Sequence, residues 1–164
     1  MQTTLERRIS ALTVRKVVIN TLPFTLPGFI ITRTRREEAC LLVEATSTAT
    51  SAICPNCQQI SWHGHGWYPR RPQDLPCIGD SVYLELTVRR FRCLNPACPK
   101  KTFAECFPDW LPIYARRTIR LTHVLQQVGF EVSAESGRRI LRWLKIKVSG
   151  DTLLRIVKHT VIAP

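Results

Sequence analysis

The chain has no hydrophobic run long enough to cross a membrane and no sign of a secretory leader. Among its 164 residues, no apolar stretch approaches the ~18 residues that a spanning helix needs. The first residues, MQTTLERRIS, are charged and lack the apolar centre of a signal peptide. Internal repeats and low-complexity tracts are also missing. We therefore expect a soluble, cytoplasmic protein without a membrane partner, large enough for one ordinary domain or two small ones.

Acidic side chains are scarce. The 12 Asp and Glu residues face 24 Lys and Arg residues, which gives a net charge of +12. The excess is uneven, because residues 111–164 hold 10 basic and 3 acidic side chains and so carry +7. Such a chain favours polyanions as partners, nucleic acid first and an acidic membrane surface second. We expect a phosphate backbone to bind the C-terminal third, where a surface kept basic only for solubility is the weaker explanation.

The cysteines do not fit a disulfide framework. They number seven, which is odd, and a reducing compartment keeps such thiols free for metal. Four of them form two pairs: Cys54 and Cys57 in the motif CPNC, and Cys93 and Cys98 with four residues between them. Four thiolates around one Zn²⁺ at ~2.3 Å make a closed structural site with no position left for water. We predict that these four cysteines bind one structural zinc ion.

Other uses of these side chains stay open at this point. A lone CPNC motif also suits a redox site, and the two pairs could be unrelated thiols. His63 or His65 could replace one ligand, although their glycine neighbours indicate an exposed turn. Cys40 is expected in the core, with Cys77 and Cys106 as structural bystanders. Basic side chains near the second pair are expected to offset the negative charge of a four-thiolate site: Arg89, Arg90, Arg92, Lys100 and Lys101.

Two stretches ahead of the cysteine pairs predict a β-hairpin. GFIITRT at 28–34 and ACLLVEATS at 39–47 are rich in β-branched and apolar residues, and the polar RREE lies between them. Gly and Pro dominate 54–79, which predicts turn and loop. Over 80–92, apolar and polar residues alternate, which predicts a strand leading into the second cysteine pair. Beyond that pair the chain is expected to be irregular through residue 112.

The hydrophobic period becomes helical after residue 116. One helical face is formed by Leu121, Val124, Leu125 and Val128. Ser133 is expected to cap a second helix, whose apolar face is formed by Gly137, Ile140, Leu141 and Leu144. Ser149 is expected to cap a third helix. Trp143 falls off the apolar face, so it would pack on the zinc unit or on a part of the protein not present here.

Three short helices with a tight link between the last two suggest a helix-turn-helix, in which the N-terminal residues of the last helix enter the major groove. The predicted groove-facing residues are Ser149, Gly150, Asp151, Thr152, Arg155, Lys158 and His159. The predicted phosphate contacts are Arg138, Arg139, Arg142, Lys145 and Lys147. The alternative is a small helical bundle whose arginines are only solvated.

Together these patterns predict an α+β fold in three parts. Residues 1–50 form an N-terminal segment with a β-hairpin, 51–110 a zinc-ribbon-like finger, and 111–164 a helix-turn-helix unit. The predicted function is zinc-stabilised binding of double-stranded DNA.

The order of the motifs resembles a known family. CPNC, HGHGWYPRRPQDLP, a hydrophobic strand, RRFRC, NPAC and FAE follow one another as in the N-terminal zinc finger of the ISL-three family of bacterial insertion-sequence transposases. YARRT, GFEVSAESGRRILRWLKIKVS and DTLLR resemble that family's helix-turn-helix segment. The resemblance spans about 22–158. Family members differ at Cys77, at Cys106 and at residues 132–133, but none of these departures removes a ligand.

The resemblance implies that the two cysteine pairs are the zinc ligands and that residues near 133–159 bind the element's terminal inverted repeats during DNA transposition. It also implies a bacterial, nucleoid-associated protein. Full-length members continue into an RNase-H-like domain with an acidic catalytic triad. The acids that follow the zinc region here are expected in turns and helices: Glu105, Asp109, Glu131, Glu135 and Asp151. We therefore expect a DNA-binding part that is not an enzyme as it stands.

Rival functions belong to other classes. The chain could be a zinc-containing transcriptional regulator, another nucleic-acid-binding module such as an RNA binder, or a repressor-like truncated transposase that competes for transposon ends. It could also be part of an enzyme whose acidic catalytic domain is supplied by a downstream frame or a second chain. Its partners are accordingly expected to be transposon-end DNA, a second copy of itself or a full-length transposase.

Overall fold

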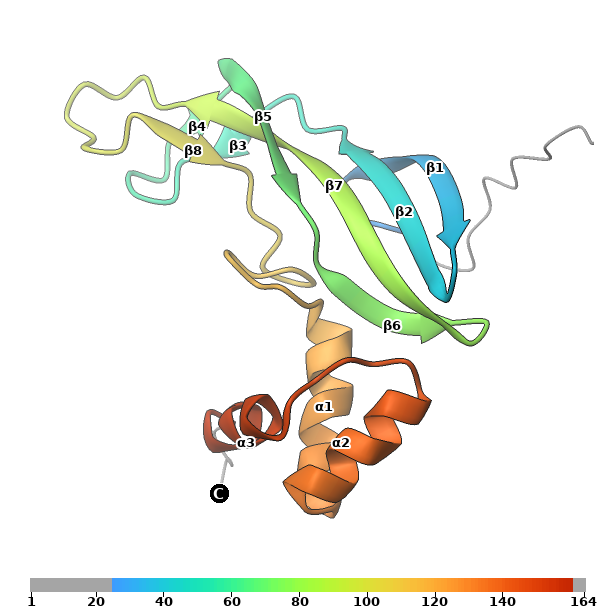
Figure 1. The fold of residues 1–164 in the computed structure, drawn as a ribbon. Coiled ribbons are helices and arrows are strands. Elements are labelled where there is room, and N and C mark those ends of the chain that lie inside the picture. The colour runs from blue at the N-terminus through green and yellow to red at the C-terminus, as the bar shows by residue number, and fades with distance from the viewer. Residues whose placement is uncertain (1–24, 161–164) are drawn as a thin grey trace, which may run out of the picture.

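The computed structural model describes residues 25–160 and shows an α+β fold with one large sheet, one small sheet and three helices (Figure 1). The expectation that the first ten residues lack a signal peptide lies outside the described residues, as do the outer ends of the first and third predicted parts. The predicted α+β class is confirmed. No helix within the described range is both long and apolar enough to span a bilayer.

The large sheet is organised around one long central strand. Its strands are β1 (Phe29–Glu37), β2 (Cys40–Ser47), β5 (Gly64–Arg70), β6 (Gln73–Cys77), β7 (Asp80–Arg92) and β8 (Thr102–Ala104). The order is β1-β2-β7-β5, and β6 and β8 also pair with β7. β2 runs parallel to β7, and the other pairings are antiparallel. The small sheet joins β3 (Ala52–Ile53) and β4 (Ile60–Ser61).

The predicted hairpin and the predicted strand over 80–92 are both present. β1 and β2 pair from Phe29 with Ser47 to Glu37 with Cys40. Glu38 in the turn adopts a left-handed φ of 51°. Along β7, every second residue is buried, and these side chains form the core together with Val43, Ala45 and Leu111: Val82, Leu84, Leu86 and Val88. The boundaries of the three predicted parts stay predictions. β2 and β7 pair with each other across the predicted boundary between residues 50 and 51.

The prediction of turn and loop over 54–79 was wrong, because β4, β5 and β6 lie there. The reason is visible in β5, where six of the seven residues are exposed. A strand with no buried face shows no alternation of apolar and polar residues, so its sequence carries no period-2 signal. The short strand β8 likewise interrupts the region expected to be irregular.

The three predicted helices are α1 (Ile119–Glu131), α2 (Ala134–Trp143) and α3 (Gly150–Lys158). The capping predictions are confirmed, since the Ser133 and Ser149 side chains accept the backbone N–H groups of Ser136 and Thr152. Thr118 caps α1 in the same way. The helices share a core formed by Leu121, Leu125, Leu141, Ile146 and Leu153.

The predicted apolar face of α2 was only half right. Gly137 and Leu141 are buried, but Ile140 and Leu144 are 45% and 51% exposed. The helix ends at Trp143, and the chain changes direction at Lys145, which has a left-handed φ of 61°. The C-terminal end of the predicted apolar face is therefore not packed against the other helices. Trp143 itself is 87% exposed and does not pack on the zinc unit.

Two polar contacts join the helices to the sheet. The buried Asp74 carboxylate in β6 accepts hydrogen bonds from Thr118 Oγ1 at 2.7 Å and Arg120 Nε at 2.7 Å. Its second oxygen forms an ion pair with the other end of the Arg120 guanidinium. Ser81 Oγ in β7 donates to the backbone carbonyl of Lys145 at 2.6 Å. The helices therefore have a defined position beside the end of the sheet that carries β6 (Figure 1).

Candidate metal centre and nucleic-acid surface

The first cysteine pair lies in a tight turn between β3 and β4. The backbone N–H of Gln58 donates to the Cys54 carbonyl at 2.9 Å, and the N–H of Cys54 donates to the Gln59 carbonyl at 2.8 Å. Gln58 takes a left-handed φ of 59°, which reverses the chain. The turn over residues 55–57 brings the sulfur atoms of Cys54 and Cys57 into one cluster.

The second pair begins directly after β7. Cys93 is the first residue beyond the strand, and its N–H donates to the Lys101 carbonyl at 2.9 Å. The Cys98 N–H donates to the Asn95 carbonyl at 3.1 Å. Ser61 Oγ donates to the carbonyl of Arg92 at 2.6 Å, which joins the two turns. The central strand thus returns the chain to the first pair.

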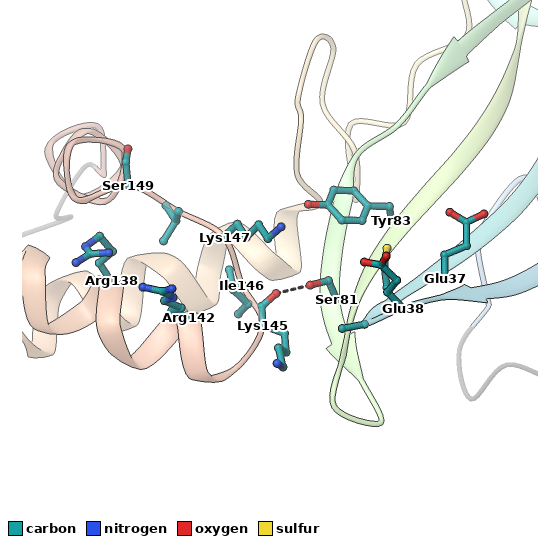
Figure 2. Close-up of a pocket in the computed structure, with 13 residues that line it drawn as sticks. Glu37, Glu38, Ser81, Tyr83, Arg138, Arg142, Lys145, Ile146, Lys147 and Ser149 are labelled. Carbon is teal, nitrogen blue, oxygen red and sulfur yellow. Dashed lines mark hydrogen bonds between the residues drawn. The ribbon is translucent and has the colours of Figure 1, made fainter.

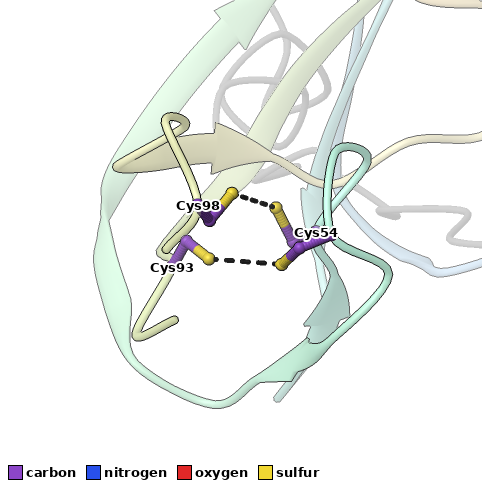
Figure 3. Close-up of side chains that lie close together, drawn as sticks. Cys54, Cys93 and Cys98 are labelled. Atoms are coloured by element: carbon purple, nitrogen blue, oxygen red, sulfur yellow. Dashed lines mark hydrogen bonds between the residues drawn. The ribbon is translucent and has the colours of Figure 1, made fainter. Parts of the chain in front are cut away.

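The four sulfur atoms meet at one point (Figure 3). All lie within 4.8 Å of one another, with Cys54 Sγ 3.9 Å from Cys98 Sγ and Cys57 Sγ 3.6 Å from Cys93 Sγ. A tetrahedron with Zn–S bonds of ~2.3 Å has S···S edges of about 3.8 Å. The sulfur positions therefore fit one Zn²⁺ ion, and the prediction of one structural zinc is confirmed by this geometry.

The surroundings of the cluster are those of a closed structural site. Cys54, Cys93 and Cys98 are buried, and Phe91 and Phe103 pack against them. Asn56 Nδ2 donates to Cys98 Sγ at 3.4 Å, which positions one sulfur atom from outside the ligand set. With four protein sulfurs and an apolar wall, no open position remains for a reacting water molecule.

The ionisation of two cysteines is shifted in opposite directions. Hydrogen bonds from the backbone N–H groups of Cys57 and Asn56 outweigh burial and lower the pKa of Cys54 to about 7. At Cys93, the N–H of Asn95 favours the thiolate, but burial and the neighbouring sulfur atoms outweigh it and raise the pKa to about 12. Burial and the neighbouring sulfur atoms therefore keep Cys93 protonated at neutral pH unless a cation offsets their charge. A divalent metal does so and deprotonates its thiol ligands outright.

The other candidate ligands lie elsewhere. His63 and His65 are exposed, and neither belongs to the cysteine cluster. Cys77 packs partly buried against the main core, whereas Cys106 is exposed. Cys40 is only half-buried, so its expected place in the core was wrong. It is the first residue of β2, at the turn of the hairpin, and lines a cleft.

The basic residues near the second pair have several roles. Lys101 Nζ donates to the carbonyl of Cys98 at 3.1 Å, which places one positive charge beside a ligand residue. Arg89 donates to the Ala49 carbonyl at 3.0 Å, and its guanidinium lies over the rings of Trp67 and Phe91. Arg90 donates to Thr102 Oγ1 at 3.2 Å. Arg92 and Lys100 are exposed.

The predicted phosphate-binding residues gather on one side of the helical part. A cleft lies between the α2–α3 segment and the turn of the β1–β2 hairpin (Figure 2). Its volume is about 840 Å³. Its helical wall carries five of the predicted DNA-binding residues: Arg138, Arg142, Lys145, Lys147 and Ser149. Glu37 and Glu38 lie on the opposite wall. A phosphate deep in the cleft would meet those carboxylates, so the exposed rim on the helical side is the more favourable place for an anion.

The remaining predicted contacts lie on the same helices, outside the cleft. Arg139 is exposed on α2, and the residues of α3 include exposed Asp151, Arg155 and Lys158, with Gly150 and Thr152 half-buried; His159 follows as the C-cap. Glu135 pairs with Arg138 at 2.6 Å and with Arg139 at 3.2 Å. The hydrogen bond from Arg138 is the main reason why the pKa of Glu135 falls to about 2. Two predicted phosphate contacts are thus held by one carboxylate.

Some residues that shape this surface were not singled out from the sequence. Asp74 anchors Thr118 and Arg120 at the start of α1, and Ser81 anchors the turn after α2. Both act across more than 40 residues of chain, since their partners are 44 to 64 residues away. Local periodicity contains no information about such pairs.

The comparisons with known proteins agree with the metal site. Residues 50–99, which include all four cysteines, match the family model of the zinc-finger of transposase IS204/IS1001/IS1096/IS1165. No curated protein and no solved structure matches the chain significantly. The family match supports the resemblance to the N-terminal part of an ISL-three-type transposase.

Proposed function

Because residues 50–99 match a transposase zinc finger, we propose that this chain is the zinc-stabilised DNA-binding portion of an insertion-sequence transposase. Its target is double-stranded DNA, and the specific sites are the terminal inverted repeats of the element. The zinc ion has a structural role, and the helical part α1–α3 contacts the duplex as a helix-turn-helix.

The observation that carries this proposal is the common side shared by the basic residues of α2 and the α2–α3 turn. Four cationic side chains, Arg138, Arg142, Lys145 and Lys147, line the same cleft wall beside Ser149 at the start of α3. Cations on one face, next to a helix N-terminus, are what a phosphate backbone needs for positioning. Residues 111–164 carry a net charge of +7. Glu135 pairs with Arg138, and Glu37 and Glu38 lie across the cleft, so Arg142, Lys145 and Lys147 on the helical rim are the cations most available to a phosphate.

The capping of α3 supports the same arrangement. Ser149 closes the N-terminus of the helix by accepting the Thr152 N–H at 3.2 Å. Gly150 and Asp151 form the first turn of α3, and Asp151 is exposed. In a helix-turn-helix these first residues read base edges while the preceding helix and turn hold phosphates. Asp151 accepts hydrogen bonds only, so it would read a cytosine amino group.

The test is a binding assay with the full chain in its zinc-loaded form. The inverted repeats that flank its gene and a shuffled duplex of equal length are compared by footprinting and by titration over a series of salt concentrations. Preferential protection of the repeats is expected. If about six phosphate contacts form, the logarithm of affinity should fall with the logarithm of salt with a slope of roughly −5.

Equal affinity for both duplexes would overturn recognition of the repeats. Protection of a promoter outside the element, in place of the repeats, would instead identify a transcriptional regulator. A matched pair of variants locates the surface: Arg142→Gln should weaken binding, whereas Arg33→Gln, an exposed arginine on β1, should not.

We also propose that residues 25–160 carry no strand-transfer centre of their own. A two-metal site for phosphoryl transfer needs several converging carboxylates. Within the described residues, the group of three or more candidate ligands is the cysteine cluster, and it contains no carboxylate. Incubation of the zinc-loaded chain with pre-cleaved repeat ends, Mg²⁺ and target plasmid should give no joined product. Joined product that persists in a Cys93→Ser variant would contradict this proposal.

A further inference from the structure

We propose that a pocket at the zinc end of the sheet binds one unpaired nucleotide of a single DNA strand. The inference rests on the proposed function only in that the ligand is nucleic acid, and it concerns a different surface from α2 and α3. The pocket has a volume of about 330 Å³, which lies at the lower end of the range for small-ligand sites.

Three strands form the floor of this nucleotide pocket. Tyr68 of β5 is directly opposite Val88 of β7, and Arg90 is two residues further along β7, so Tyr68 and Arg90 point to the same face of the sheet. Arg90 is in turn opposite Ala104 of β8. The same face of β7 is covered by the core further along, but at the zinc end it opens into the pocket.

The rim of the pocket carries a second aromatic ring. Tyr114 is 86% exposed and has a left-handed φ of 61°, a conformation that costs free energy for a residue with a side chain. The segment around it is held by Arg70, which donates to the carbonyls of Pro112 at 2.9 Å and Ala115 at 3.0 Å. The backbone on both sides of this exposed ring is thus fixed by specific contacts.

The charges around the pocket favour an anion. Arg90 uses one nitrogen for Thr102, and Lys100 on the rim is exposed and makes no hydrogen bond or ion pair with the described residues. The acid that lines the pocket, Glu105, is 8% exposed, and its Oε1 accepts the backbone N–H of Arg89 at 2.8 Å. A phosphate can therefore approach Lys100 and Arg90 with its repulsion by Glu105 reduced.

Two accessible tyrosine rings beside two cations match a single strand better than a duplex. Paired bases are stacked on each other and hide their faces, whereas an unpaired base offers its face to an aromatic side chain while a cation holds the phosphate. Single-stranded DNA is present wherever an element's end is opened or cleaved, which gives this pocket a role beside duplex binding.

The pocket also depends on the metal centre. Pro55, which lies between the ligands Cys54 and Cys57, lines its wall, and Lys100 follows the ligand Cys98 by two residues. Loss of zinc should therefore disorder two sides of the pocket while the helices keep their own core. Chelation is expected to weaken single-strand binding more than duplex binding.

The experiment measures fluorescence anisotropy of a labelled oligothymidine with the zinc-loaded full chain. Tyr114→Ala is expected to weaken single-strand binding about tenfold, the effect of one lost stacking contact. Tyr114→Phe keeps the ring and should retain affinity, and Lys100→Gln should reduce the salt dependence. Trp143→Ala removes an equally exposed ring from the helical part and serves as the matched control. Zinc content and circular dichroism establish that each variant is folded.

The outcomes separate this inference from the proposed function. Specific binding of the repeats without any single-strand binding would overturn the pocket and leave the duplex function intact. Single-strand binding without preference for the repeats would support the pocket and overturn recognition of the repeats. Unchanged affinity in both Tyr114→Ala and Lys100→Gln overturns the assignment. Competition by free thymidine monophosphate at the same concentration as the oligonucleotide would overturn the single strand as ligand in favour of a free nucleotide.

Discussion

The hydroxyl of Ser81 donates a 2.6 Å hydrogen bond to the backbone carbonyl of Lys145. Ser81 lies near the start of the central strand, and Lys145 lies in the turn between α2 and α3 (Figure 2). Lys145 has a left-handed φ of 61° and lies beyond the end of α2, so its carbonyl has no partner within that helix. The sheet supplies the missing donor and thereby sets the direction in which α3 begins.

Removal of this donor should cost stability. Ser81→Ala leaves the Lys145 carbonyl without its partner, and we expect a loss of about 1–2 kcal/mol in the free energy of unfolding. Urea titration followed by circular dichroism measures it. Ser51→Ala, a half-buried serine whose hydroxyl makes no such bond within residues 25–160, is the control. Equal stability of the two variants would show that the Ser81 contact contributes nothing.

The zinc site should require all four thiols. Cys93→Ser replaces a buried ligand by a poor one, and because structural zinc supplies about 10–16 kcal/mol in small fingers, we expect loss of the metal and unfolding of the zinc end. The measurement is zinc per chain by elemental analysis, with near-ultraviolet circular dichroism. Cys106→Ser, at an exposed cysteine outside the cluster, should keep one zinc. A Cys93→Ser protein that retains one zinc would show that the ligand set is different.

Close packing between α2 and α3 should not tolerate a methyl group. A Cβ at Gly137 would lie 2.7 Å from Leu153 Cδ2, a buried side chain, and 3.3 Å from Val128 Cγ1. Gly137→Ala is therefore expected to destabilise the helices by about 1–3 kcal/mol. Gly150→Ala is the matched control, since the nearest atom would be 3.9 Å away. It should be neutral or slightly stabilising. Thermal unfolding of both variants decides, and equal melting temperatures would contradict the packing argument.

Glu135 should compete with DNA for its two arginines. It pairs with Arg138 and Arg139, so Glu135→Gln leaves both guanidinium groups available to phosphates. We expect tighter duplex binding and a salt dependence steeper by about one unit, because a further phosphate contact forms. The measurement is a salt-dependent titration with duplex DNA. Weaker binding by this variant would mean that the carboxylate orients the arginines productively.

The same ion pair should make α2 sensitive to acid. The pKa of Glu135 is lowered from 4.5 to about 2, chiefly by the hydrogen bond from Arg138. A depressed carboxyl pKa stabilises the folded state at pH values above the unfolded pKa, and this contribution disappears as pH falls towards 2. Helix content followed by circular dichroism should decline over that range in the native chain. Glu135→Gln should lose this part of the dependence, and an identical acid profile would exclude Glu135 as its source.

Much of the metal site could be predicted because it depends on residue type and spacing. Cysteine pairs such as Cys54 with Cys57 identify thiolate ligands whatever the surrounding fold, and β7 is long and has one buried face, so its alternation is strong. The helix caps Ser133 and Ser149 could also be predicted, because a cap is a local interaction over three residues.

The remaining features depend on contacts that are distant in sequence. β5 could not be predicted because neither of its faces is buried, so exposed Trp67 and Tyr68 follow no period. Ile140 was assigned to the core because helical periodicity does not reveal where a short helix stops being covered. The attachment of Asp74 to Thr118 and Arg120 joins segments 44 and 46 residues apart. Only the fold brings such residues together.

One continuous strand links the two ends of this protein. From Ser81, beside the helices, to Cys93, at the metal, β7 rises ~3.3 Å per residue and so covers ~40 Å. One turn of B-form DNA is about 34 Å long, so an elongated ligand that touches both ends must extend over slightly more than a helical repeat. If the proposed duplex contacts both ends, insertion of two residues within β7 would preserve its side-chain alternation, lengthen that reach and alter the size of the DNA segment protected.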